Sequence, residues 1–309
     1  MGGSVRTVLG DVLPGSLGPT YAHEHLLARP GGDWARGDAD LALDDEDRSA
    51  LDLEMFLRVG GRGLVDATTE ELGRNPEGLR RLSARTGVHV VACTGHVSEE
   101  HCRGAVDLDA ASESELAERL VRDLSDGLDG TSVRAGVIKV GSSVDRVTGA
   151  ERKLMRAAAA AHRETGAPIT THTSAGTAAL EQVRVLEGVD ADLTRVCIGH
   201  LDRRLVWADH VALARSGVYL GYDCVGKEQY QPDAERVRFI TRLIREGHGE
   251  QVLLAGDMAR RRYLVSWGGA PGYAFIIRDF LPLLRQAGVG EEEIGGLMVD
   301  NPARFLAWA

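Results

Sequence analysis

Two histidines stand two positions apart in the stretch TYAHEHLLA, residues 20–28, with Glu24 between them. In a β-strand, residues i and i+2 point to the same face, so a strand here would direct His23 and His25 one way and Glu24 the other. Two neutral imidazoles on one face can hold a transition metal. They can equally be polar residues at a strand end that hydrogen bonds satisfy, so the pair alone leaves both interpretations open.

Four further residues with metal-binding or acid–base chemistry follow apolar runs elsewhere in the chain. They are Lys139 in GVIKVGSS, His172 in PITTHTSAGT, His200 in IGHLDR and Asp257 in LLAGDMARR. Each of these side chains, taken singly, is more often a satisfied polar group than a ligand. Together with the first pair they place four imidazoles, one amine and one carboxylate at the ends of five runs, and this combination predicts a metal site.

The elements that would position these residues are short β-rich runs alternating with helical patterns. Such alternation is typical of a parallel sheet, and eight units in about 300 residues favour an α/β fold of the (β/α)8 TIM-barrel type. Active sites of these barrels lie at the carboxyl ends of the strands, so all six residues would meet at one face. The eight runs are 20–25, 63–69, 88–94, 133–140, 167–173, 194–200, 217–223 and 251–257.

Helices are predicted from the patterns at 46–62, 149–166, 177–190 and 233–249, and the segment 271–309 reads as a closing helix plus a C-terminal helix. The Gly-rich, acidic stretch LARPGGDWARGDADLALDDED is expected to form a loop over the active face. With no linker that would divide the chain, we expect a single domain over residues 1–309.

The composition of the chain limits the classes of partner that it is expected to bind. The chain has 36 Lys and Arg against 46 Asp and Glu, a net charge of −10 with no basic tract, which disfavours nucleic acid. Its apolar runs are too short to span a membrane, and no secretory signal is visible, so we expect a cytoplasmic enzyme that acts on a small molecule. The four scattered cysteines read mostly as small core residues in a reducing compartment. A homodimer would be in keeping with the barrel fold, because dimers are common in barrels of this kind.

The order of these motifs resembles the phosphotriesterase family of the amidohydrolase superfamily. The resemblance covers nearly the whole chain and is carried by AHEHL, GVIKVGSS, PITTHTSAGT, IGHLDR, LLAGDMARR and DNPARFLA. It implies a binuclear centre with two divalent metal ions and a metal-bridging hydroxide that attacks the substrate. The implied roles are His23, His25 and Asp257 on the more buried ion, His172 and His200 on the more exposed ion, and Lys139 as the bridge between them.

Lys139 can take this role only if carbon dioxide converts it to a carbamate. An ammonium has three donors and no lone pair, so it cannot ligate a metal. Burial beside two cations should depress the lysine pKa and expose the neutral amine, and N-carboxylation then gives an anion with two oxygens. Two ions lower the pKa of a shared water, and Asp257 would take the proton released by its attack. We expect zinc, although manganese, cobalt or iron would suit the same ligands.

The substrate is less constrained by the sequence. Members of the family acting on phosphorylated sugar lactones resemble this chain in VGKEQYQPDAER and GDMARRRY, where Lys227, Arg260 and Tyr263 are expected to hold the substrate phosphate. The alternative is a phosphotriesterase acting on organophosphates or a carboxylester hydrolase. The low aromatic content of 5% argues against a dedicated organophosphate hydrolase. A Schiff-base lyase on Lys139 is a further alternative that leaves the four histidines unexplained.

Overall fold

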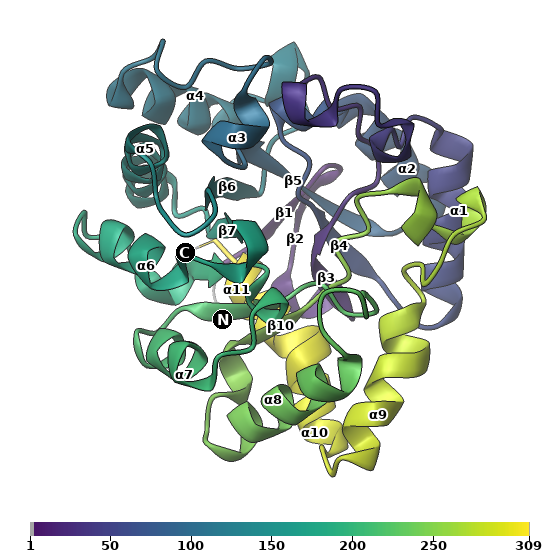
Figure 1. Cartoon of the computed structure of the whole chain (residues 1–309). Coiled ribbons are helices and arrows are strands. Elements are labelled where there is room, and N and C mark those ends of the chain that lie inside the picture. Colours follow the sequence, from purple (N-terminus) through teal and green to yellow (C-terminus); the bar gives the residue numbers. More distant parts are fainter. Residues whose placement is uncertain (1–2, 309) are drawn as a thin grey trace.

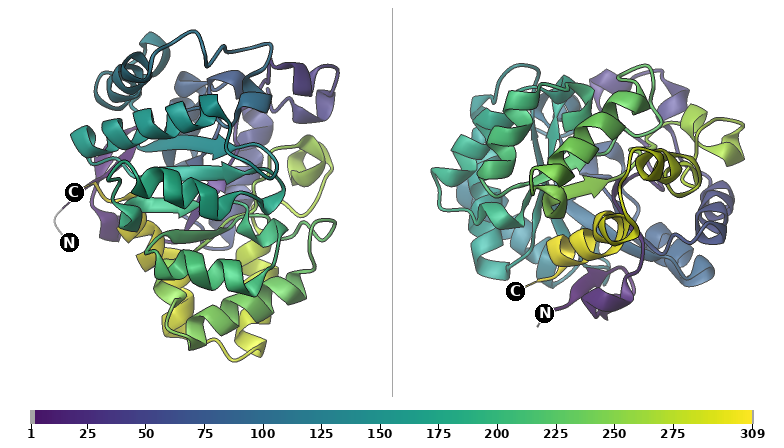
Figure 2. Two further views of the ribbon diagram at one scale, coloured as in Figure 1. Left: turned by 60° about the vertical axis from the view of Figure 1, so that its left-hand side comes forward. Right: turned by 90° about the horizontal axis from the view of Figure 1, so that it is seen from below.

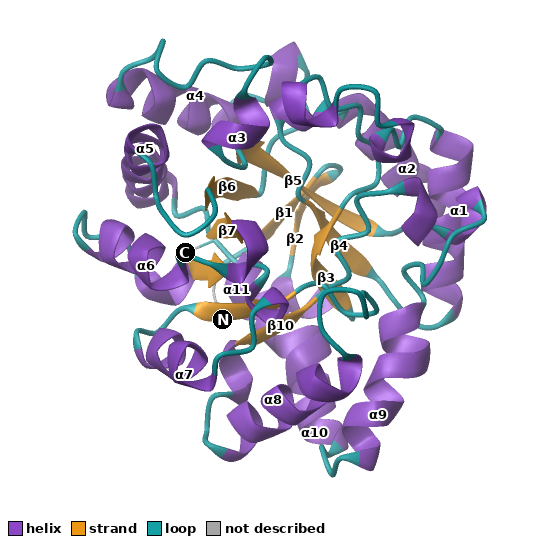
Figure 3. Cartoon of the chain, viewed as in Figure 1, coloured by secondary structure: helices purple, strands orange, loops and turns teal. Residues whose placement is uncertain are grey.

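Eight parallel strands form the centre of the molecule, and helices surround them in the computed structural model, which describes residues 3–308. The strands pair in chain order, each with the next, and Figure 3 shows them as an inner group within a ring of helices. This confirms the TIM-barrel prediction. The barrel strands are β3 (Thr20–Glu24), β4 (Gly63–Asp66), β5 (His89–Gly95), β6 (Val137–Ser142), β7 (Ile169–Thr173), β8 (Val196–Ile198), β9 (Tyr219–Tyr222) and β10 (Val252–Leu254).

All eight predicted runs overlap a strand, but most strands are shorter than the runs, and β5 and β6 extend past the predicted ends at residues 94 and 140. The fourth run starts at residue 133, whereas β6 begins at Val137. The sixth and eighth strands end at Ile198 and Leu254, so His200 and Asp257 lie in the segments that follow the strands. Ladder hydrogen bonding stops where the chain turns away from the barrel, which the apolar pattern of a run does not reveal.

Helices follow the strands and cover the outside of the barrel (Figures 1 and 3). The helix over 149–165 illustrates why they form where they do. The side chain of Thr148 accepts the backbone N–H of Glu151, the Glu151 carboxylate accepts the N–H of Thr148, and Gly166 ends the helix in a left-handed conformation. The helices are α1 (Glu46–Arg58), α2 (Pro76–Thr86), α3 (Glu99–Cys102), α4 (Glu113–Ser125), α5 (Gly149–Thr165), α6 (Ala179–Glu187), α7 (Trp207–Arg215), α8 (Asp233–Arg245), α9 (Leu281–Gln286), α10 (Glu291–Gly295) and α11 (Asn301–Leu306).

A buried side chain helps to close the seam between the last and first barrel strands. Glu24 points away from His23 and His25 and accepts hydrogen bonds from the backbone N–H groups of Gly256 at 2.6 Å and Met258 at 2.9 Å. The i, i+2 argument made for this stretch is therefore confirmed. Glu24 ties the segment carrying Asp257 to the strand carrying the two histidines, which fixes the predicted ligands relative to one another.

Two apolar layers hold the barrel together. Residues such as Val65, Val91 and Leu253 point into the barrel, while their strand neighbours Leu64 and Val90 pack outward against the helices. All four cysteines are buried with free thiols, as expected of core residues.

An N-terminal hairpin of β1 (Val5–Thr7) and β2 (Gly10–Val12), absent from the sequence prediction, lies across the amino ends of the strands beside the chain's C-terminal segment. Figure 2 shows the two ends of the chain side by side. The N–H of Trp308 donates to the carbonyl of Ser4, so both ends lie far from the face that carries the chemistry. None of the helices within residues 3–308 has the length and apolar character that crossing a membrane requires.

Candidate metal centre

One cavity at the carboxyl ends of the strands collects all six residues predicted as metal ligands. It measures about 200 Å³, which suits a small substrate. The acidic loop after β3 contributes Ala28, Pro30, Trp34 and Leu41 to its wall, so the prediction that this loop covers the active face is confirmed. The six residues are His23, His25, Lys139, His172, His200 and Asp257.

His23, His25 and Asp257 form a compact group. Their potential ligand atoms all lie within 4.8 Å of one another. The Asp257 Oδ1 atom is 3.3 Å from His25 Nε2 and 3.8 Å from His23 Nε2. The other ring nitrogen of His25 hydrogen-bonds the Thr68 hydroxyl at 2.8 Å, which turns Nε2 toward Asp257. This is the group that the sequence assigned to the more buried ion.

Lys139 is buried, with only 1% of its surface exposed, and its amine lies 3.1 Å from His23 Nε2. Burial lowers the pKa of this lysine, although the carboxylates of Asp223 and Asp257 oppose the shift. A charged Lys139 ammonium would point an N–H donor at the His23 imidazole. Among residues 3–308, no carboxylate oxygen lies within 4.0 Å of the Lys139 amine. The surroundings therefore favour the neutral amine, which is the form that carbon dioxide can carboxylate.

His172 and His200 line the same cavity as Lys139. Their ring centroids are 4.5 Å apart, and the His200 ring is 4.7 Å from that of His23. Burial and the neighbouring imidazoles hold the pKa of His172 well below its usual value, and burial lowers that of His23 to about 3. Neutral imidazoles are the form that binds metal, so the donor set fits two divalent ions.

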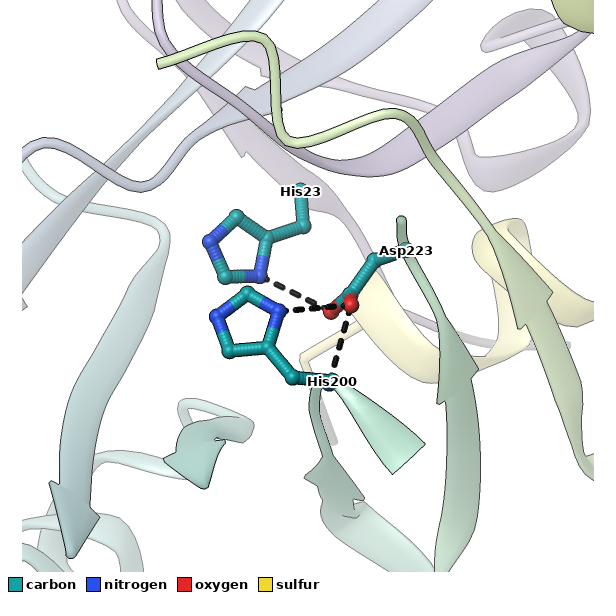
Figure 4. A group of neighbouring side chains, drawn as sticks. All are labelled: His23, His200 and Asp223. Carbon is teal, nitrogen blue, oxygen red and sulfur yellow. Dashed lines mark hydrogen bonds and ion pairs between the residues drawn. The ribbon is translucent and has the colours of Figure 1, made fainter. Parts of the chain in front are cut away.

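Asp223, at the end of β9, orients two of these imidazoles at once (Figure 4). Its Oδ2 atom lies 3.0 Å from His23 Nδ1 and its Oδ1 atom 2.7 Å from His200 Nδ1. Although burial raises its pKa, the charges and hydrogen bonds of the two rings hold the pKa of Asp223 far below the usual range. An ionised carboxylate accepts from both Nδ1–H groups, which leaves both Nε2 lone pairs for metal.

Two of the predicted ligands have strained backbones. His200 has φ of 57° and Asp257 has φ of 47°, in the left-handed region that residues with a Cβ rarely adopt. Each conformation costs on the order of 1–3 kcal/mol and persists only where surrounding contacts over-determine it. Here the His200 N–H donates to Asp223 and the Asp257 N–H donates to the His23 carbonyl, so the strain is maintained by the site itself.

The three residues predicted to hold a substrate phosphate lie close together but differ in access to the cavity. Arg260 lines it, and its guanidinium donates to Asp38 at 2.6 Å and Asp40 at 3.3 Å. Lys227 is buried, is absent from the cavity wall, and pairs with the Asp257 carboxylate at 2.6 Å. Tyr263 lies next to Lys227, whose amine is 4.8 Å from the centroid of the tyrosine ring.

Two further histidines follow β5, His96 and His101, and only one of them reaches the cavity. His101, in α3, lines the cavity with its ring against His172 at 5.2 Å and Trp34 at 4.7 Å. His96 is buried behind the wall, where its Nδ1 donates to Glu71 at 2.8 Å.

Comparison with known sequences identifies the chain. The sequence model described as Phosphotriesterase family matches residues 3–306. The chain belongs to the phosphotriesterase family. It is therefore a metal-dependent hydrolase, and the resemblance carried by the six motifs is confirmed.

Three members of the family illustrate the range of similarity. A phosphotriesterase homology protein of Escherichia coli is 34% identical over 290 residues, covering 94% of this chain and 98% of its own, and its structure holds phosphate in the active site (TM-score 0.89). A lactonase from Listeria monocytogenes has a TM-score of 0.96 with 34% identity and 99% coverage of both chains. The human N-acetyltaurine hydrolase is 29% identical over 350 residues, covering 100% of this chain and 99% of its own.

Two residues of this family member's site were missed by the sequence prediction. Asp223 ends the predicted strand 217–223, so the rule that selected the six ligands applies to it as well. Arg203 also lines the cavity, in the turn that follows His200. The next residue, Arg204, carries the same charge but does not line the cavity. No pattern in the sequence distinguishes the two arginines.

Proposed function

We propose that this hydrolase holds two divalent metal ions, with zinc as the expected metal, and opens a sugar lactone that carries a phosphate. The observation that carries the proposal is the distribution of chemistry around the cavity. The six ligands form its floor, while Arg203, Tyr230 and Arg260 contribute a cationic wall from the loops after β8, β9 and β10. The side chains of Pro30, Leu41, Leu72 and Val97 add apolar lining to the same cavity. Similarity to a lactonase supports the same substrate class.

The roles of the residues follow from their positions. The metal ions, when bound, supply a water of lowered pKa and polarise the substrate carbonyl. Asp257 presents one carboxylate oxygen to His25 and the other to Lys227. The Lys227 ammonium keeps Asp257 ionised at neutral pH, since it holds the pKa of this carboxyl well below the usual value against the effect of burial. An ionised Asp257 can accept the proton of the attacking water.

We assign the substrate phosphate to the loops after β9 and β10, where Lys227, Arg260 and Tyr263 lie. Loops after the last two strands of such barrels commonly build a phosphate site. Arg260 offers a planar fork at the cavity wall, and 24% of its side chain is exposed. The acidic residues that now accept its hydrogen bonds, Asp38 and Asp40, belong to the covering loop and would have to give way to a substrate dianion.

A second candidate is hydrolysis of an N-acyl amide with a sulfonate at its far end. The similarity to the N-acetyltaurine hydrolases over essentially the full chain favours it. Both candidates share one architecture, a carbonyl at the metal ions and a tetrahedral oxyanion at the cationic wall. They differ in the bond that is cleaved, which is an ester in the lactone and an amide in the N-acyl compound. One substrate panel therefore tests both.

The test is a substrate panel on protein reconstituted with zinc, manganese or cobalt. Pentono-1,4-lactones with and without a 5-phosphate, N-acetyltaurine, a triester organophosphate and a phenyl acetate represent the competing activities. We expect the phosphorylated lactone to have the highest kcat/KM. Preference for the triester or the acetate would overturn the proposal, and borohydride trapping of substrate on Lys139 would indicate the lyase instead.

Arg260→Ala tests directly whether this arginine binds the substrate phosphate. One charge-assisted hydrogen bond contributes about 1.5–3 kcal/mol, so the preference for the phosphorylated over the plain lactone should fall about 10- to 100-fold. Arg278→Ala, on an exposed arginine paired only with Asp279, serves as the control. Equal losses of activity on both lactones would show that Arg260 does not contact the phosphate.

A further inference from the structure

Three cationic side chains, Lys227, Arg260 and Arg203, lie in or beside the cavity wall. They differ in whether a carboxylate already pairs with them. Lys227 pairs with Asp257 at 2.6 Å, and its amine also donates to the Asp257 carbonyl. Arg260 pairs with Asp38 and Asp40. Arg203 has no carboxylate within 4.0 Å of its guanidinium anywhere in residues 3–308. An anion that enters the cavity therefore meets Arg203 as the cation without a competing partner.

The guanidinium of Arg203 is also without a hydrogen-bond acceptor in the described part of the chain, although it offers five N–H donors. The acidic residue next to it, Asp202, does not serve, because the Asp202 carboxylate is fully buried and pairs with Arg236 at 2.6 Å. An unengaged guanidinium in the cavity that also holds the predicted metal ligands is therefore a candidate for binding an anionic group of the substrate.

Tyr230 fixes the position of this free cation. The Arg203 guanidinium stacks over the Tyr230 ring, 4.3 Å from the centroid, and both side chains line the cavity. The Lys227 amine lies 5.9 Å from the centroid of the same ring. Stacking leaves the edge of the guanidinium, with its paired N–H groups, available for a bidentate contact to an oxyanion. The backbone holds the turn in place, since the Arg203 N–H donates to the His200 carbonyl at 3.1 Å.

We propose that Arg203, held on the Tyr230 ring, is the principal residue that binds the tetrahedral oxyanion at the far end of the substrate. This inference rests on the proposed function only for the identity of the substrate, because the free cation in the cavity would bind a phosphate or a sulfonate alike. Arg203 would join the residues predicted to hold the phosphate, Lys227, Arg260 and Tyr263. Unlike Lys227 and Arg260, it can bind an anion without first releasing a carboxylate. It also ties the anion to the turn that carries His200, so the tail and the reacting end of a substrate are positioned by neighbouring residues.

The experiment uses metal-loaded enzyme and two probes that carry only the tail, propyl phosphate and propanesulfonate. Binding is measured by isothermal titration calorimetry and, for turnover, as competitive inhibition. Arg203→Gln removes the charge and the fork, and we expect affinity for the better-bound probe to fall about 10- to 100-fold. Arg203→Lys keeps the charge without the fork and should recover part of this loss. The better-bound probe identifies the tail as phosphate or sulfonate.

Arg204→Gln is the matched control. Arg204 is the next residue, carries the same charge, has a side chain that is 52% exposed and lies outside the cavity wall. We expect it to bind both probes as the wild type does. Equal losses in the two variants, or undiminished binding by Arg203→Gln, would overturn the inference. Because the calorimetric result does not require turnover, failure of the lactone panel with a selective loss in Arg203→Gln would reject the proposed substrate and retain the anion site.

Discussion

The carboxylate of Asp223 accepts two hydrogen bonds from His200, one from the ring Nδ1 at 2.7 Å and one from the backbone N–H at 2.8 Å. The first fixes the ring tautomer, and the second holds the left-handed backbone that aims the ring at the cavity. The other oxygen of the same carboxylate accepts from His23. One buried side chain thus controls a ligand on each side of the proposed pair of ions.

Asp223→Asn should weaken binding of both metal ions, because an amide has one acceptor oxygen for two Nδ1–H donors. Loss of such an orienting partner typically costs 10- to 100-fold in metal affinity. The measurement is metal content by mass spectrometry during titration with a chelator. Asp209→Asn, in the half-buried start of α7, is the control. Wild-type affinity for both ions in Asp223→Asn would show that the tautomers are set elsewhere.

Lys139→Ala should lose metal and activity, because it removes the group expected to bridge the two ions. Adding a short carboxylic acid such as propionate should restore part of both, since a carboxylate can occupy the bridging position. Lys139→Glu should retain more metal than Lys139→Ala for the same reason. Lys153→Ala, whose amine donates to a backbone carbonyl on the outside of the barrel, is the control. Two ions bound to Lys139→Ala as tightly as to the wild type would exclude the bridge.

His23→Ala and His25→Ala test the buried ion. Each removes one imidazole from the group that includes Asp257, so each should release metal and abolish turnover. His162→Ala is the control, because His162 lies in α5, its Nδ1 donates to the Ala167 carbonyl beyond the helix end, and it is not among the residues that line the cavity. Full activity in a metal-free double variant would rule out metal catalysis at this site.

The strand-end pattern was sufficient to find the barrel and all six cavity-floor residues, because both depend on local sequence. Every parallel strand is an apolar run, and polar residues at the carboxyl ends of such runs meet at one face. The pattern also reaches Asp223. The sequence around Asp223, however, does not indicate which imidazoles this aspartate contacts, because His23 and His200 lie 200 and 23 positions away in the chain.

Pairing between charged side chains could not be predicted. Lys227 and Arg260 were identified as cations near the cavity, yet the sequence does not show that Asp257 engages one and Asp38 and Asp40 the other. Arg203 was overlooked for the converse reason. Whether an arginine is neutralised depends on tertiary contacts with loops far away in the chain, so the free cation of the cavity is visible only in three dimensions.

His101 should act as a neutral donor toward a hydroxyl of the substrate. The Ser98 hydroxyl accepts the backbone N–H of His101 at 3.4 Å and lies 2.7 Å from the ring Nδ1. We expect the hydroxyl to donate its hydrogen to Nδ1, since no other acceptor for this hydrogen lies among residues 3–308. Nδ1 is then the acceptor nitrogen, so Nε2 carries the proton. Burial lowers the pKa of His101, which keeps the ring neutral.

His101→Phe keeps a ring between Trp34 and His172 but removes the donor. A neutral hydrogen bond contributes about 0.5–1.5 kcal/mol, so kcat/KM for a hydroxylated lactone relative to γ-butyrolactone should fall about 2- to 10-fold. His248→Phe, at the far end of α8, is the control. The same ratio in His101→Phe and wild type would mean that Nε2 meets no substrate hydroxyl.

The wall that carries His101 depends in turn on a buried carboxylate, and this gives a prediction for acid stability. Glu71 is fully buried, and its two oxygens accept from His96 Nδ1 at 2.8 Å and from the Val97 N–H at 2.7 Å. Burial alone would raise its pKa, but the contacts with His96 and the Val97 N–H lower the pKa of Glu71 below the usual 4.5. A carboxyl whose folded-state pKa is lowered stabilises the fold above its unfolded pKa.

Glu71→Gln should therefore reduce the free energy of unfolding at pH 7 by about 1.5–3 kcal/mol, the value of hydrogen bonds to a charged group. The difference from the wild type should shrink as the pH falls below about 4.5 and through the folded-state pKa, because protonation removes the same interactions from Glu71 itself. Urea unfolding followed from pH 7 down to about pH 3 measures both effects. Glu70→Gln, the exposed neighbour, should show neither. A difference between wild type and Glu71→Gln that stays constant with pH would indicate that Glu71 contributes through packing and not through its charge.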